Sequence, residues 1–436
     1  MIGIVVDHPS RDLPNLCILS SEFIKKNTNV ALIPSYKIDH VLLDNPDIFK
    51  VIIFNFFRLE NLKTILYAKT KNIKVAILDQ ESIAGIDGLG MTNVFKNKIL
   101  RKYLKYIDYY FFPSKLIMKE CLKYNLENPL NCIVTGYQRL DLIKKKIQNI
   151  ENKNFVIICT NFPAVNPLFT TKKKIINDEI KYRSNYVPAK ALKKNISEVE
   201  LTFASFTNEI TKVINKFNNI NFIIRPHPFE NQKHWKVLEK YKNCKVTNAF
   251  NSLEWISKCL ALIHIDCTTS IEASILNKPS LSLLYANKKN KIKGVFKLAH
   301  DCSYLCNNQK QVEKNLKLAI KKKLKTKKPK IIDNFFYSPN ELASSIIIKN
   351  ILNKSNQSKN LKININLNFI SYIKYFIEKY LGKKIHNIFL SLYRGKKIEI
   401  ARKQKQISIS LIKNYINPKV SILEERFFFI LKKKTK

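Results

Sequence analysis

The chain has 436 residues, of which 77 are Lys or Arg and 33 are Asp or Glu, so its formal net charge is +44. Hydrophobic residues make up 45% of the chain and aromatic residues 11%, a composition that supports buried cores and excludes general disorder. The length fits two domains with an appendage, and the presence of only 8 glycines excludes collagen-like and glycine-rich low-complexity chains.

Short apolar runs alternate with amphipathic segments in the first third of the chain. Strands are predicted at residues 2–6, 30–34, 51–55, 75–79, 109–112 and 132–135, and helices at 16–26, 59–70, 93–105 and 114–124. Continuous β-branched runs separated by helices of this length predict a parallel, doubly wound sheet that is covered on both faces.

The pattern starts again after a polar, charged stretch at residues 144–153. Strands are predicted at 155–160, 222–225, 245–247, 260–265 and 280–284, with helices at 199–217, 232–241, 252–258 and 270–276. The chain therefore predicts two Rossmann-like doubly wound α/β domains, residues 1–148 and 149–320, that face a cleft.

Residues 321–436 differ in character from the rest of the chain. They hold 28 Lys+Arg against 6 Asp+Glu, a net charge of 28 − 6 = +22, and segments 369–380 and 385–393 place aromatic residues among lysines at helical spacing. We expect a basic, mainly helical extension that rests on an anionic membrane surface. Two alternatives stay open: these helices pack on the body of the protein, or the lysines only solvate a surface.

Several features bear on location and partners. No run of about 18 apolar residues occurs, and the first six residues read as a strand rather than a signal peptide. The nine cysteines are scattered without a C-x-x-C pair, which is typical of reduced thiols. We expect a cytoplasmic protein, and because no nucleic-acid module is recognisable we expect no nucleic-acid partner.

The first chemically informative segment follows the predicted strand 222–225. Arg225, His227 and Glu230 come in quick succession, and prolines flank the histidine. Ligands of parallel α/β sheets bind beyond the carboxyl ends of the strands, so Arg225 and His227 are predicted to bind a phosphate. The alternative is a turn with a surface histidine.

A second segment follows the predicted strand 260–265. Thr268, Thr269 and Ser270 are predicted to cap the next helix, and their hydroxyls with its free N–H groups would form an anion site. Glu272, in the first turn, is predicted to reach a ribose hydroxyl. The alternative is an ordinary helix start with an acid favoured by the helix dipole.

Two acids end the predicted strand 75–79. Asp79 and Glu81 precede a loop with three of the eight glycines, a place suited to a general base, although an exposed acidic turn is the alternative. No Gly-Lys-Ser/Thr follows, so the loop is not a nucleotide P-loop.

Three further positions follow strands. Thr160, after the first strand of the second domain, is predicted to contact a bound donor. His8 and Arg11, after strand 2–6, would contact an acceptor or a leaving phosphate, or else only cap their loop. No metal-ligand cluster stands out, so no metal is expected.

These motifs, and their order along the chain, resemble those of bacterial surface-carbohydrate biosynthesis proteins of the GT-B glycosyltransferase type. Those proteins are related to capsule polysaccharide transferases and CDP-glycerol glycerophosphotransferases. The resemblance covers about residues 1–320 and rests on Arg-Pro-His-Pro at 225–228, Thr-Thr-Ser-Ile-Glu-Ala at 268–273, Lys-Pro at 278–279, Thr-Gly-Tyr-Gln-Arg-Leu-Asp at 135–141 and Asp-Gln-Glu at 79–81.

The resemblance implies roles for particular residues. In related bacterial sialyl- and Kdo-transferases an acidic loop of the first domain supplies the base and a His-Pro element of the second binds the nucleotide phosphate. Carried over, Glu81 or Asp79 would deprotonate the acceptor and His227 would bind the donor phosphate. The chain departs from that pattern because Gln80 separates the two acids and Ser82 stands where glycine is usual.

The expected function is therefore transfer of a sugar from a nucleotide-activated donor to a glycan or lipid-linked acceptor in capsule, lipopolysaccharide or O-antigen synthesis. We expect an enzyme that needs no metal or cofactor, and from the charge of residues 321–436 we expect it to be peripheral on the inner face of the cytoplasmic membrane. The alternatives are a CDP-glycerol-type polyol-phosphate transferase, a nucleotide-sugar 2-epimerase, and a non-catalytic polyanion- or membrane-binding protein.

Overall fold

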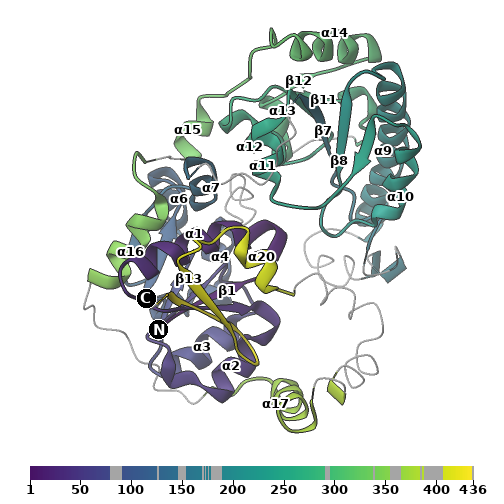
Figure 1. Ribbon diagram of the computed structural model, residues 1–436. Helices are drawn as coiled ribbons and strands as arrows, with labels where there is room; N and C mark the ends of the chain where they lie inside the picture. The colour runs from purple at the N-terminus through teal and green to yellow at the C-terminus, as the bar shows by residue number, and fades with distance from the viewer. Residues whose placement is uncertain are drawn as a thin grey trace. The chain divides into compact units, whose positions relative to one another are not determined.

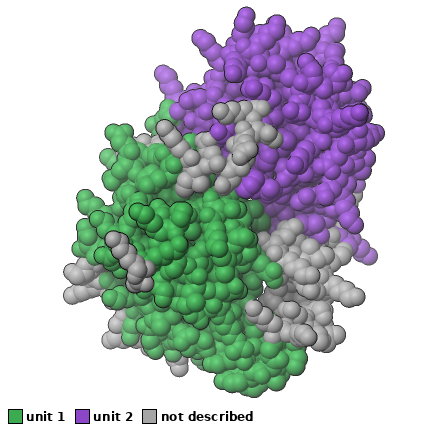
Figure 2. Space-filling model, in the orientation of Figure 1, with its two compact units in different colours: residues 1–147, 333–436 green, residues 148–332 purple. Residues whose placement is uncertain are grey.

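A computed structural model describes most of the chain, in two compact units. The first unit contains residues 1–147 and 333–436, and the second contains residues 148–332 (Figure 2). The described residues are 1–78, 91–124, 127–145, 154–168, 171, 173–174, 176–177, 189–289, 295–336, 339–353, 365–382, 385–386 and 406–434.

The first unit is built on a sheet whose parallel strands run in the order β2-β1-β3-β4-β5-β6. These strands are β1 (Ile2–Val6), β2 (Val30–Pro34), β3 (Val51–Phe54), β4 (Lys74–Ile77), β5 (Tyr109–Phe112) and β6 (Cys132–Val134). Strands β1, β2, β3 and β5 are buried along their whole length, as continuous apolar runs covered on both faces require.

Helices connect these strands, and short polar residues begin several of them. The connecting helices are α1 (Pro9–Lys25), α2 (Ile38–Asp44), α3 (Leu62–Thr70), α4 (Met91–Lys96), α5 (Lys98–Arg101), α6 (Lys115–Leu122) and α7 (Asp141–Lys144). The Ser114 side chain accepts a hydrogen bond from the Ile117 N–H at the start of α6, and the Asn97 side chain does the same for α5.

The C-terminal segment packs into this first unit. It contains α16 (Ala343–Asn353), α17 (Phe369–Phe376), the π-helical turn η8 (Ile377–Leu381), α20 (Ile409–Lys413), β13 (Val420–Glu424) and β14 (Phe429–Lys433). Strand β14 pairs antiparallel with β2, with Leu431 opposite Val30, and β13 pairs with β14. The hairpin covers the edge of the parallel sheet, whose N–H and C=O groups would otherwise be unpaired.

Residues 321–436 were expected to form a separate, mainly helical extension, and the structure divides the chain differently. Residues 333–436 belong to the first unit, and their β-hairpin was not predicted. Asp141 is one reason why this segment packs where it does: its carboxylate accepts hydrogen bonds from Ala343 N (3.0 Å), Ser344 N (2.8 Å) and Ser344 Oγ (2.6 Å) at the start of α16. Burial raises the pKa of Asp141.

The second unit has a fully parallel sheet of order β12-β11-β10-β7-β8-β9 (Figure 1). Its strands are β7 (Phe155–Cys159), β8 (Asn221–Arg225), β9 (Cys244–Val246), β10 (Ala261–His264), β11 (Ser280–Ser282) and β12 (Tyr304–Leu305). Its helices include α9 (Ala189–Lys216), α10 (Gln232–Lys236), α11 (Ser252–Lys258), α12 (Thr269–Ile275), α13 (Val295–Asp301) and α14 (Gln309–Ile320).

Strand β7 shows why both faces of this sheet are apolar. Val156 and Ile158 belong to one core cluster with Phe206 of α9, whereas Phe155 belongs to the cluster on the opposite face with Trp255 of α11. Successive strand side chains point to opposite faces, so a run without polar residues buries both.

The prediction of two doubly wound α/β domains is confirmed. Every predicted strand is present, with ends that differ by at most two residues, and β12, β13 and β14 were not predicted. Among the described residues, no helix combines the length and apolarity needed to span a bilayer.

Candidate functional site

The strand order of the second unit defines where a ligand would bind. The chain passes from β7 outward through β8 and β9, then returns to β10 on the other side of β7. The loops after β7 and β10 therefore diverge at a topological switch point, where open parallel sheets bind ligands. Asn161 follows β7 and donates through Nδ2 to the backbone oxygen of Asp266, which follows β10 (2.9 Å).

Glu230 organises the loop after β8. It is fully buried, and its Oε1 accepts hydrogen bonds from Thr160 Oγ1 (2.7 Å), Phe162 N (2.8 Å) and His227 N (3.2 Å). Its Oε2 accepts one from Trp235 Nε1 (2.9 Å). Burial raises the pKa of Glu230 while these hydrogen bonds lower it, and the net direction is upward. Four donors on one carboxylate match its ionised form.

His227 is held within this loop. Its Nδ1 accepts a hydrogen bond from the Phe229 N–H (3.2 Å), so a neutral imidazole carries its proton on Nε2. The ring is therefore oriented by one local bond while Glu230 holds the backbone N–H of the same residue. An Nε2–H donor at the carboxyl end of β8 suits a phosphate oxygen.

Two other predicted donor-binding residues have protein partners here. The Arg225 guanidinium donates to the backbone oxygens of Ala249 (2.6 Å) and Phe250 (3.1 Å), in the loop between β9 and α11. Thr160 donates its hydroxyl to Glu230. Both residues therefore shape the loops around the switch point, and their contact with a donor stays a prediction.

The start of α12 differs from the expected hydroxyl cap. Thr268 is the N-cap residue, but its side chain makes no capping hydrogen bond, and Thr269 Oγ1 lies 3.0 Å from Cys267 Sγ. Ser270 Oγ is fully buried and lies 3.0 Å from both Cys267 O and Ala299 O. Its hydroxyl thus ties α12 to α13, because Ala299 belongs to α13.

Glu272 also faces a protein partner. Its Oε2 accepts a hydrogen bond from Ser252 Oγ (3.2 Å), which joins α12 to the first residue of α11. Glu272 is buried. Its predicted contact with a ribose hydroxyl stays a prediction.

Sequence reasoning missed a buried charge cluster beside the switch point. Asp266 Oδ1 lies 2.6 Å from His300 Nε2, and Asp266 Oδ2 lies 2.6 Å from Lys289 Nζ. Burial raises the pKa of Asp266, but the His300 hydrogen bond and the Lys289 charge outweigh it and lower the pKa to about 2. Asp266 lies two residues after the end of β10 and has a left-handed φ of 49°, which is uncommon outside glycine. Its position after a predicted strand is the only signal of this cluster in the sequence.

A second buried histidine adjoins this cluster. His264 Nδ1 accepts from Cys267 N (3.3 Å), and its Nε2 lies 2.8 Å from Ser303 Oγ, which donates to Ala299 O. Burial, followed by the His300 charge, lowers the pKa of His264 to about 3. The ring is therefore neutral at pH 7, and Ser303 and Cys267 satisfy both nitrogens.

The first unit has its own switch point, between β1 and β3. Buried Asp12 accepts hydrogen bonds there from His8 N (2.9 Å), Arg11 Nε (2.7 Å) and Asn55 Nδ2 (2.9 Å). Arg11 Nη2 also lies 3.6 Å from Asp7 Oδ2. The structure thus brings His8 and Arg11 together around Asp12, and their contact with an acceptor stays a prediction.

Asp79 and Glu81, the predicted base, lie outside the described residues. The strand that leads to them is present as β4, which lies between β3 and β5 in the sheet of the first unit. Their role as a general base stays a prediction.

No family model matches the chain, and no curated protein matches it. Among solved structures, UDP-GlcNAc 2-epimerase of Methanocaldococcus jannaschii in complex with UDP-GlcNAc and UDP is 14% identical, with 81% of this chain and 99% of that chain covered and a TM-score of 0.49. S. aureus MnaA with UDP is 13% identical, with 81% and 96% covered and a TM-score of 0.49. The pneumococcal O-GlcNAc transferase GtfA, in complex with UDP and GlcNAc, is 9% identical, with 72% and 58% covered and a TM-score of 0.33. Similarities of this size carry no argument for the fold or activity of this chain.

Proposed function

We propose that the protein is a glycosyltransferase of surface-polysaccharide synthesis that binds a nucleotide-activated sugar in its second unit. The observation that carries the proposal is the loop after β8, which Glu230 holds in place and which orients the imidazole of His227. The loop follows β8, which pairs with β7, and β7 is one of the two strands at the switch point. Phosphate-bearing ligands of such sheets bind at the switch point.

In the proposed reaction an acceptor hydroxyl attacks the anomeric carbon of the donor sugar. The bond from that carbon to the nucleotide phosphate breaks, and the phosphate leaves with the bonding electrons. His227 Nε2–H donates to a phosphate oxygen as its charge grows. Because the hydrogen bond from Phe229 N already fixes the ring, the Nε2–H group needs little reorganisation during the reaction. A hydrogen-bond donor oriented in advance is the basis of electrostatic catalysis.

The general base follows from the resemblance to GT-B proteins, and the donor contacts follow from the position of their residues after β10. Asp79 or Glu81 takes the proton of the acceptor hydroxyl as general base. Thr268 and Thr269 lie beside the switch point for donor contact, and Glu272 is the proposed partner of the ribose. The acceptor is a glycan or a lipid-linked molecule, and the proposal requires no cofactor.

The C-terminal segment supports peripheral membrane association as part of this proposal. On its inner side, α17 binds α2 through Ser371 Oγ to Asp39 (2.6 Å) and Tyr375 OH to Asp44 (2.8 Å). On its other side Phe369 is 78% exposed and Phe376 is 56% exposed. Exposed aromatic residues on a segment of net positive charge fit an anionic bilayer interface.

Two experiments test the parts of the proposal separately. For the enzyme, calorimetric titration with CMP, CDP, UDP and GDP should give binding of one nucleotide, followed by assay of the matching nucleotide-sugar with and without lipid-linked acceptor. Sugar transfer to the acceptor supports the proposal. Conversion of the donor sugar to an epimer without any acceptor would replace it with the epimerase alternative.

Membrane binding is measured as the fraction of protein that sediments with anionic phosphatidylglycerol vesicles. This fraction should fall to a small part of the wild-type value in the variant that combines Phe369→Ser and Phe376→Ser. The control is Leu201→Ser, which removes a 59% exposed apolar side chain from α9 in the second unit. Equal binding by both variants would remove the membrane from the proposal.

A further inference from the structure

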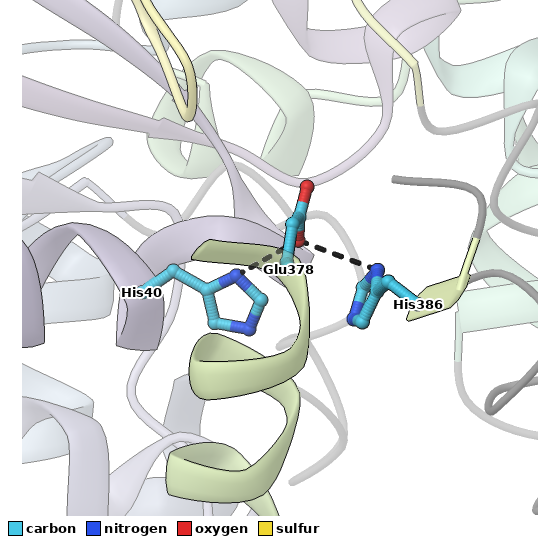
Figure 3. A group of neighbouring side chains, drawn as sticks. All are labelled: His40, Glu378 and His386. Atoms are coloured by element: carbon cyan, nitrogen blue, oxygen red, sulfur yellow. Dashed lines mark ion pairs between the residues drawn. The ribbon is translucent and has the colours of Figure 1, made fainter. Parts of the chain in front are cut away.

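Two histidines and a glutamate that belong to neither switch point converge in the interior of the first unit. His40 comes from α2, Glu378 from η8, and His386 from the described pair 385–386. Each offers one ligand atom, and these atoms all lie within 4.8 Å of one another. All three residues are at most 2% exposed. Figure 3 shows both imidazole rings with a nitrogen directed at the same carboxylate.

The distances within this group fit a metal ion. His40 Nδ1 lies 3.1 Å from Glu378 Oε2, and His386 Nδ1 lies 3.4 Å from the same oxygen. A tetrahedral zinc ion places neighbouring ligand atoms about 3.3–3.5 Å apart, because Zn–N and Zn–O distances are about 2.0–2.2 Å. Two imidazole nitrogens and one carboxylate oxygen are also a donor set that suits Zn²⁺ better than Mg²⁺ or Ca²⁺. We propose that His40, Glu378 and His386 bind one Zn²⁺ ion.

Lys37 is the competitor for this site. Its Nζ forms an ion pair with Glu378 Oε2, the oxygen that both histidines approach. A zinc ion bound to that oxygen would repel the ammonium, so we expect zinc binding to displace Lys37. In this ion-paired position Nζ also lies 5.5 Å from the ring centre of Tyr36 and 5.7 Å from that of Phe427, within the range of a cation–π contact.

The ion would fix the C-terminal segment to the N-terminal part of the first unit. Glu378 lies 341 residues after Lys37 in the chain, and η8 also accepts hydrogen bonds from Arg426 Nη2 through the backbone oxygens of Glu378 and Lys379 (both 2.6 Å). A metal that binds only this folded arrangement stabilises it against unfolding. The site is therefore structural, and its test needs no activity of the proposed transferase.

The test uses the full chain after chelation, with zinc sulfate as the probe in calorimetric titration. We expect one Zn²⁺ per chain, a higher Tm in its presence, and roughly 100-fold or greater loss of affinity in His40→Ala and in His386→Ala. His234→Ala, which removes an exposed histidine of α10, should bind zinc as the wild type does. Lys37→Met should bind zinc roughly tenfold more tightly, because the competing charge is gone.

Two results of the titrations would overturn the proposal. One is the absence of zinc binding in both the wild type and Lys37→Met. The other is zinc binding that His40→Ala and His386→Ala leave unchanged, which would assign the ion to another site. If an alanine variant fails to fold, cobalt substitution of the wild type decides: tetrahedral nitrogen and oxygen ligation gives intense visible bands, and a weak octahedral spectrum contradicts the site.

Discussion

Glu230→Gln should destabilise the second unit by about 3 kcal/mol. The glutamine oxygen can replace Oε1 and keep the bonds from Thr160, Phe162 and His227, but its amide nitrogen then faces the Trp235 Nε1–H, donor against donor. A buried donor left unsatisfied costs about 1–3 kcal/mol, and the three retained bonds lose the strengthening that a charged acceptor gives them. Together these effects exceed the ordinary cost of a surface change.

A double-mutant cycle with Trp235→Phe isolates the cause. In the wild type, Trp235→Phe leaves Glu230 Oε2 without its donor, whereas in Glu230→Gln it removes the donor that faces the amide nitrogen. The double variant should therefore lose less free energy of unfolding than the sum of the two single variants, by about 1 kcal/mol or more. Urea unfolding of the four proteins measures the cycle. Glu239→Gln, whose oxygen can still accept from Val246 N, is the matched control. Additive changes, or a Glu230→Gln variant as stable as the control, would refute this account of the loop.

Two further predictions concern pH and the C-terminal hairpin. His264 is neutral in the folded chain with a pKa of about 3, below its unfolded value of about 6.5, so the unfolded chain takes up a proton first and stability falls as the pH drops between those values, by up to about 1.4 kcal/mol per pH unit. Urea unfolding at pH 7 to 4 should show a flatter fall in His264→Asn, and an unchanged slope would contradict the neutral histidine. Deleting residues 418–436 removes β14 from the edge of β2, so Tm should fall and light scattering should show self-association; an unaltered, monodisperse protein would contradict the covered edge.

The sheets were predictable because their signal is local. Runs such as 155–159 are apolar at every position, and only a strand covered on both faces fits them. β14 carries a similar run, Phe429 to Leu431, but it lies in a basic tail and pairs with β2 almost 400 residues earlier, a pairing that no local pattern indicates. The hairpin was therefore missed, although its apolar residues were visible.

The candidate site shows the same difference between local features, which the sequence predicts, and contacts between distant parts of the chain, which it does not. The loop that carries His227 was predictable, since its position after a strand is a local property of the chain. The partners of Arg225 and Ser270 were not, because backbone oxygens of distant loops leave no mark in the sequence. The same holds for the pairing of Asp266 with His300, which joins a strand end to a helix 34 residues later.

Nucleotide binding by His227→Gln tests the central claim most directly. The matched control is His234→Gln, an exposed histidine on α10 whose Nε2 lies 3.4 Å from Thr207 Oγ1. Calorimetric titration of the full chain with the best of CMP, CDP, UDP and GDP should give a Kd for His227→Gln roughly tenfold or more above that of the wild type, since a hydrogen bond to a charged phosphate contributes about 1.5–3 kcal/mol. The control should bind as the wild type does. Equal affinity in all three proteins would contradict the assignment of the loop after β8 to the donor phosphate.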